Sequence, residues 1–135
     1  MITIRPDATV REMVRVLEEN RIGALVVSED EGKTLVGIIS ERDVVRELNH
    51  VGGAVLDQPV RNLMTTDVHT CQPEDELEAL AHTMTEKRVR HLPVVVDGEL
   101  KALVSIGDVV KHRIDELQAE RDQLVDYVHT SYRST

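Results

Sequence analysis

The chain has 135 residues and a net charge of −9, from 25 acidic and 16 basic side chains. This balance argues against a duplex-binding surface, because phosphate contacts need clustered Lys and Arg, and the scarcity of aromatic residues leaves few platforms for stacking single-stranded bases. The lone Cys71 excludes an internal disulfide, no Cys/His spacing resembles a zinc site, and no apolar run approaches the roughly 18–20 residues that span a bilayer. We therefore expect a cytoplasmic protein with no nucleic-acid or membrane partner and no metal.

The first half of the chain predicts a short opening strand followed by an amphipathic helix. Val10, Met13, Val14 and Leu17 recur at i, i+3, i+4 and i+7, which places them on one buried helical face. Asp7 is the expected N-cap of this helix.

Two short β-branched runs, residues 21–27 and 35–40, follow the helix and predict the strands of a hairpin. The acidic tip between them, residues 29–34, is expected to be simply solvated. The second run leads directly into Ser40-x-x-Asp43, where a further helix should begin.

After a linker, residues 51–66, the second half repeats this order of elements, and such a repeat dictates the architecture. A second amphipathic helix is expected with Asp75 as its N-cap. Asp97-Gly98 separates the next two strands and strongly predicts a tight hairpin turn. Ser105-x-x-Asp108 then starts the last helix.

The last helix is predicted to continue to about Val128. Its apolar residues Ile114, Leu117, Leu124 and Val128 are too sparse for a core helix. We interpret this part as a surface extension, solvated or paired with the same helix of a dimer mate.

Residues 90–95 before one hairpin and residues 37–45 after the other resemble the two signature stretches of the CBS (cystathionine-beta-synthase) domain family, and Met64-Thr65 is similar to its linker. The resemblance covers nearly the whole chain, in both copies and in the expected order. It implies an α/β (α+β) fold of two CBS repeats, each strand-helix-strand-strand-helix, packed about a pseudo-two-fold axis, with two nucleotide clefts and a long C-terminal helix.

On this basis we divide the chain into four parts. They are the first repeat (1–50), the linker (51–66), the second repeat (67–113) and a C-terminal helical extension and tail (114–135).

The resemblance also implies that each cleft joins the Ser-x-x-Asp motif of one repeat to the opening and second strands of the other. The first cleft would be lined by Ser40, Arg42, Asp43, Thr66, Val68, His69, Arg90, His91, Leu92 and Pro93. The second would be lined by Ser105, Asp108, Thr3, Gly23, Ala24 and Leu25.

The second cleft departs from the family pattern in two ways. Residues 23–26 replace the His-Leu-Pro stretch and leave a barer wall. The chain also starts almost at its opening strand, which leaves no room for the upstream segment that encloses one nucleotide in family members. The first cleft is therefore the expected site for a phosphorylated ligand.

The Ser-x-x-Asp motif has a binding and a structural interpretation. A helix N-terminus offers unpaired N–H groups and a positive dipole end to phosphate, and a carboxylate one turn further can accept the hydroxyl protons of a ribose. The same spacing also approximates a capping box. The two roles are compatible.

Cationic groups favour the first cleft. Arg42 occupies the position of Gly107 in the other repeat and can clamp phosphate oxygens, or it forms a surface salt bridge with Glu41 or Glu47. Arg90 and His91 can line the end of the first cleft that would hold the ligand's phosphate, although a histidine beside a strand often has only a structural role.

The resemblance implies a non-catalytic regulatory sensor of an adenine nucleotide, with AMP as the first expectation and NAD(H), ADP or ATP as alternatives. It would signal through a homodimer to a separate effector protein. One rival is a structural dimerisation or protein-interaction module with no physiological nucleotide. The other is an enzyme such as a nucleotide hydrolase, which would need a metal-binding carboxylate cluster beside the cleft.

Overall fold

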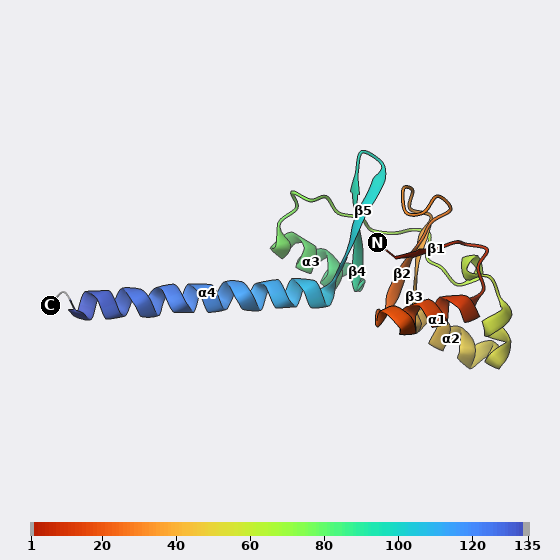
Figure 1. The fold of residues 1–135 in the computed structure, drawn as a ribbon, viewed down its shortest axis with the longest axis horizontal. Helices are drawn as coiled ribbons and strands as arrows, with labels where there is room; N and C mark the ends of the chain where they lie inside the picture. Colours follow the sequence, from red (N-terminus) through yellow and green to blue (C-terminus); the bar gives the residue numbers. More distant parts are fainter. Residues whose placement is uncertain (1, 134–135) are drawn as a thin grey trace.

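A computed structural model describes the backbone of residues 2–133 and the side chains of residues 2–125 (Figure 1). The elements in chain order are β1 (Thr3–Ile4), α1 (Val10–Asn20), β2 (Ala24–Val27), β3 (Gly37–Ser40), α2 (Glu41–Val51), the 3-10 helices η1 (Gly52–Asp57) and η2 (Val60–Asn62), α3 (Leu77–Lys87), β4 (His91–Val96), β5 (Glu99–Ser105) and α4 (Ile106–Arg133). This order confirms the predicted mixed α/β fold of two repeats followed by a long helix.

The first repeat is built on a three-stranded sheet of order β1-β2-β3. The central strand β2 runs parallel to β1 and antiparallel to β3, with Val26 opposite Ile38. All four residues of β2 are buried, and Leu25 and Val27 pack in one core cluster with Met13 and Leu17 of α1. The linker adds to this sheet at Thr65, which exchanges two backbone hydrogen bonds with Ile38 (2.8 and 3.0 Å).

The second repeat has the two-stranded sheet β4-β5, and its predicted opening strand is reduced to one bridge. Cys71 donates its N–H to the Pro93 carbonyl (2.9 Å) and accepts the Val95 N–H (3.0 Å). The preceding bond of a parallel ladder would have to come from the nitrogen of Pro93, which carries no hydrogen. The pairing therefore stops at Cys71.

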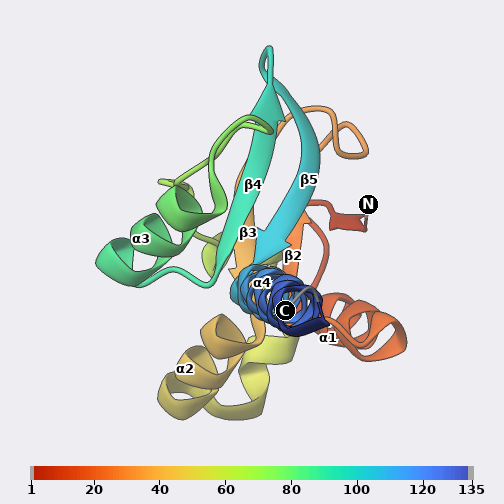
Figure 2. The same cartoon turned by 90° about the vertical axis from the view of Figure 1, so that its left-hand side faces the viewer.

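Equivalent backbone hydrogen bonds confirm that the two halves are repeats. The Glu41 N–H at the start of α2 donates to the Gly23 carbonyl (3.0 Å), and the Ile106 N–H at the start of α4 donates to the Arg90 carbonyl (2.8 Å). Both bonds tie the start of a helix to the residue just before the repeat's second strand. The hairpins β2–β3 and β4–β5 point to one side of the molecule, and α1, α2 and α4 lie on the other (Figures 1 and 2).

The predicted tight turn is confirmed, but both predicted N-caps are wrong. Asp97 and Gly98 have φ of 51° and 80°, as a type I′ hairpin turn requires. α1 begins after Thr9, whose hydroxyl accepts an N–H of the first turn (3.2 Å). It does not begin at Asp7, because the carbonyls of Pro6 and Ala8 accept hydrogen bonds from the backbone N–H groups of the linker instead. α3 begins after Glu76, because the Asp75 carboxylate closes the preceding turn instead (2.8 Å).

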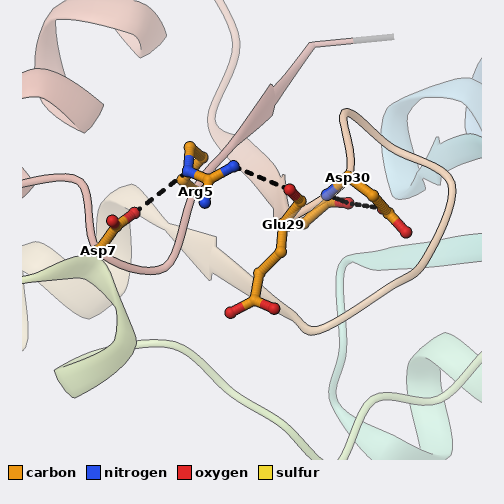
Figure 3. A network of polar contacts seen from close by, with 5 residues as sticks. Arg5, Asp7, Glu29 and Asp30 are labelled. Atoms are coloured by element: carbon orange, nitrogen blue, oxygen red, sulfur yellow. Dashed lines mark hydrogen bonds and ion pairs between the residues drawn. The ribbon is translucent and has the colours of Figure 1, made fainter.

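The acidic hairpin tip is more ordered than a simply solvated loop. Asp30 Oδ1 accepts hydrogen bonds from the Ser28 hydroxyl (2.7 Å) and the Thr34 N–H (2.8 Å). These bonds lower the pKa of Asp30 to about 2. Arg5 holds the same loop by donating to the Glu29 carbonyl at 2.8 Å (Figure 3).

The tip also reaches the second repeat, because the Lys33 carbonyl accepts the Leu100 N–H (2.9 Å). This backbone bond joins the two hairpins.

The predicted helical extension is a continuous part of α4, which leaves the second repeat as a single rod (Figure 1). The side chains of Ile114, Leu117 and Leu124 are exposed, as a surface or dimer-contacting helix requires. The side chain of Val128 and the tail residues 134–135 lie outside the described residues.

Candidate functional site: a cleft between the repeats

A cleft of about 360 Å³ lies between the two repeats. Its walls are the start of α2, the end of the linker at Thr65 with residues 67–69 that follow it, the turn before β4 and the start of α4. The volume falls in the range of roughly 300–1,000 Å³ in which small-molecule sites occur. Neither repeat forms the cleft alone, so its shape depends on how the two halves meet.

Most residues predicted for the first cleft meet here. The lining residues among them are Ser40, Arg42, Asp43, Val68, His69, Arg90 and His91. Thr66 lies on the linker between two residues that line the cleft. Leu92 and Pro93 are buried in β4 and, contrary to the prediction, do not line the cleft.

The residues predicted for the second cleft separate. Gly23 and Ser105 line the same cleft as Asp43. Ala24 and Leu25 are buried in β2. Thr3 lies on β1, and Asp108 lies in the exposed first turn of α4; neither lines this cleft.

Both Ser-x-x-Asp motifs form hydrogen-bonded helix starts, so the structural interpretation of the motif is realised. Asp43 Oδ2 accepts the Ser40 N–H (2.8 Å) and the Ser40 hydroxyl (3.1 Å). Asp108 Oδ2 accepts the Ser105 N–H (2.9 Å), while the Ser105 hydroxyl accepts the Asp108 N–H (3.1 Å). Of these two aspartates, only Asp43 lines the cleft.

Four arginines line the cleft, although the whole chain carries a net charge of −9. Arg46 lies 4.0 Å from Asp43 Oδ1, whereas no ion pair between described residues involves Arg42, Arg88 or Arg90. Guanidinium groups are well suited to phosphate because they donate in a planar fork.

Sequence reasoning missed two of these arginines, and each had a local signal. Arg46 follows Arg42 by four residues and therefore shares its helix face. Arg88 matches Arg21 in the first repeat, and both end a helix in the left-handed conformation, with φ of 56° and 53°. That backbone turns the chain from α3 into the cleft wall.

His91 is half-buried beside the starts of both helices, α2 and α4. Burial lowers the pKa of its imidazole, and the nearby Arg90 lowers it further, while the carboxylates of Asp108 and Glu41 act in the opposite direction. The hydrogen bond from the Ser105 backbone lowers the pKa of Asp108. These effects together favour the neutral form of His91, which lines the same cleft as the four arginines.

Within the part of the chain that the structure describes, no group of three or more His, Cys, Asp or Glu residues is placed to hold a metal ion. Among the described residues, no helix combines the length and apolar character that crossing a membrane requires.

Comparison with known proteins agrees with this architecture. The CBS domain family matches residues 1–50 and 60–115. The mitochondrial CBS domain-containing protein CBSX3 of Arabidopsis thaliana is 35% identical over 129 residues, which cover 93% of this chain and 63% of that relative. The chain thus spans less than two thirds of the plant protein's length.

Two solved structures share the fold. A CBS-domain containing protein from Agrobacterium tumefaciens has a TM-score of 0.80 at 40% identity, covering 84% of this chain and 89% of that chain. CBSX2, solved in complex with AMP, has a TM-score of 0.71 at 28% identity, covering 85% and 88%. With two matched repeats and the shared fold, the chain belongs to the CBS domain family.

Proposed function

We propose that this chain is a regulatory sensor that binds an adenine nucleotide, AMP in the first place, in the cleft between its repeats. The observation that carries the proposal is one cleft of about 360 Å³ lined by four arginines and only three acidic residues, Glu41, Asp43 and Asp67, in a chain of net charge −9. NAD(H), ADP and ATP are the alternative ligands. The AMP complex of the related CBSX2 supports the choice of an adenine nucleotide.

In this proposal the ligand's phosphate lies among Arg42, Arg88 and Arg90, which have no ion-pair partner among the described residues. The start of α2 adds the positive end of its helix dipole. Asp43 accepts hydrogen bonds from the ribose hydroxyls through Oδ1, since its Oδ2 is already held by Ser40. The ligand is bound and not transformed.

The four-part division of the chain is part of the same proposal. Residues 1–50 and 67–113 are the two repeats, 51–66 the linker and 114–135 the extension and tail. We propose that a dimer carries the signal to a separate effector protein. The ligand can shift the dimer between two conformations only as far as it binds one of them more tightly. We propose a cytoplasmic location, whereas the plant relative is mitochondrial by name.

Isothermal titration of the purified full chain with AMP, ATP and NAD tests the proposal. We expect heat of binding with at least one adenine ligand, and inorganic phosphate serves as the control for unspecific anion binding. A folded protein that binds none of the three ligands would falsify the sensor function.

The second candidate function is a dimerisation or protein-interaction module without a physiological nucleotide. It is favoured by the exposed apolar side chains of α2 and α4, such as Val45 (63% exposed) and Leu124 (62%). Small-molecule mass spectrometry of freshly purified protein separates the candidates, because a sensor is expected to release a nucleotide and an interaction module is not.

A further inference from the structure

α4 carries a stripe of exposed hydrophobic side chains along one face. Val110, Ile114, Leu117 and Leu124 are 48–62% exposed and follow one another at intervals of four, three and seven residues. These are the intervals of the core positions of a coiled-coil heptad. Within the seven-residue interval the core position is occupied by Arg121.

The same face carries a shallow, largely open hollow near the start of the helix. A depression of about 530 Å³ is lined by Ile106, Gly107, Val110, Ile114 and neighbouring residues. Gly107 occupies a core position of the same heptad, and a Cβ at this residue would approach only the Ser105 hydroxyl, at 3.6 Å. The stripe therefore has a small residue over a hollow at one end and Leu124 at the other.

We propose that α4 pairs with α4 of a second copy of this chain as an antiparallel coiled coil, in which Leu124 of each copy fills the hollow at Gly107 of the other. This register also places Ile114 opposite Leu117 and Val110 opposite Arg121. The interface is isologous, as a two-fold dimer requires, because each copy gives and receives the same contacts.

Charged side chains favour the antiparallel orientation in two ways. It brings Arg113 of one copy beside Glu120 of the other, in the flanking positions that set partner orientation in coiled coils. A parallel pair would place the two copies of Arg121 opposite each other in the core. In the antiparallel pair they lie about 16 Å apart along the seam, at about 1.5 Å per residue.

In the single chain, Arg113 forms an ion pair with Glu116 one turn further along the same helix (3.1 Å). Both side chains are well exposed, so this local pair contributes little. Arg113 can therefore contact Glu120 of a second copy at small cost.

The pairing would also touch the wall of the nucleotide cleft. Arg90 and Ile106 line both the cleft and the hollow at Gly107. A second copy seated in the hollow thus contacts the residues that border the ligand site. The pairing of two α4 helices needs no ligand. The dimer can therefore be absent in a protein that binds a nucleotide, and it can form in a protein that binds none.

The first test compares Leu124→Asp with Gln123→Asp by sedimentation equilibrium of the full chain. Both variants add one negative charge, but Gln123 lies off the stripe. We expect Leu124→Asp to weaken dimerisation by at least about tenfold, since it removes a central apolar contact, and Gln123→Asp to leave it unchanged. Circular dichroism verifies that both variants keep their helices. A monomeric wild type, or equal dimerisation by both variants, overturns the proposal.

The second test reads the orientation. Arg113→Glu and Glu120→Arg should each weaken the dimer, and the double variant should restore it, because the opposite charges then face each other again. Additivity of the two single changes contradicts the antiparallel register.

Cysteine cross-linking gives an independent readout of the same register. Under oxidising conditions, a mixture of Gly107→Cys and Leu124→Cys chains should form a disulfide-linked pair. Leu124→Cys alone should not cross-link, whereas a parallel coil would join Leu124→Cys to itself.

Discussion

Asp43 combines a structural and a proposed binding role, and these can be separated by comparison with Asp108. Each carboxylate accepts the backbone N–H of the serine three residues before it, at 2.8 and 2.9 Å. Substitution by alanine should therefore cost both helices a similar amount, about 1 kcal/mol. The two residues differ in that only Asp43 lines the cleft.

We predict that Asp43→Ala weakens AMP binding by roughly 1–3 kcal/mol, the scale for polar partners left unmatched, and that Asp108→Ala leaves it nearly unchanged. Titration calorimetry of both variants measures the difference. Unchanged affinity in Asp43→Ala together with lost affinity in Asp108→Ala would show that the ligand lies elsewhere.

His91 should make ligand binding depend on pH. Burial and Arg90 lower its pKa in the free protein, against the opposing effect of Asp108 and Glu41. A phosphate beside the imidazole favours the charged form and raises this pKa. Affinity should then be highest below the free-state pKa and should fall as pH rises through the bound-state pKa.

The measurement is the number of protons taken up on AMP binding, obtained by calorimetry in buffers of different ionisation enthalpy. Wild type should take up more protons than His91→Gln, and this comparison cancels the titration of the ligand's own phosphate. His50→Gln is the matched control, because His50 lies in the last turn of α2 and does not line the cleft. Equal uptake by wild type and His91→Gln contradicts the prediction.

At the scale of elements, the linker depends on a glycine in β3. A Cβ on Gly37 would lie 2.7 Å from the Thr65 carbonyl oxygen and 3.1 Å from the Met64 sulfur. Thr65 cannot retreat without breaking its two backbone hydrogen bonds to Ile38. The close approach of linker and strand therefore requires glycine.

We predict that Gly37→Ala lowers the free energy of unfolding by roughly 1–3 kcal/mol, as overpacking does. Gly53→Ala is the control, because a Cβ there meets no atom within 4 Å. That change should be neutral or stabilising by up to about 1 kcal/mol. Urea denaturation of both variants provides the measurement, and equal stability of the two would contradict the role of Gly37.

For the whole molecule, the proposed site would couple ligand binding to the association of the two repeats. Its lining residues come from both repeats and from the linker. A ligand that binds only the folded state should raise the free energy of unfolding by about 2.7 kcal/mol at a concentration of 100 times Kd.

We expect this gain to appear as a shift of one cooperative transition, followed by scanning calorimetry with and without AMP. Two separate transitions, of which the ligand moves only one, would place the site within a single repeat. Inorganic phosphate at the same ionic strength controls for unspecific stabilisation.

The sequence alone determined the features that depend on local or periodic patterns. These include the repeated order of elements, the Asp97-Gly98 turn and the long final helix. Each follows from spacing within a short window, where backbone geometry and burial periodicity act directly. The Ser-x-x-Asp spacing also predicted the helix starts at Ser40 and Ser105, whose hydrogen bonds stay within four residues.

Only the tertiary structure decided how the cleft is assembled. It brought Arg46 and Arg88 to the cleft and placed Gly23 and Ser105 in the same cleft as Asp43. It also moved the caps of α1 and α3, because the chain before each helix is committed to other hydrogen bonds.

The opening strand of the second repeat shows the same limit. It is reduced to a single bridge at Cys71. Before Cys71 the pairing ends because Pro93, on a strand more than 20 residues away, has no N–H to donate. The two repeats can thus be predicted from short-range sequence patterns. The shape and charge of the cleft between them depend on long-range contacts that no local pattern specifies.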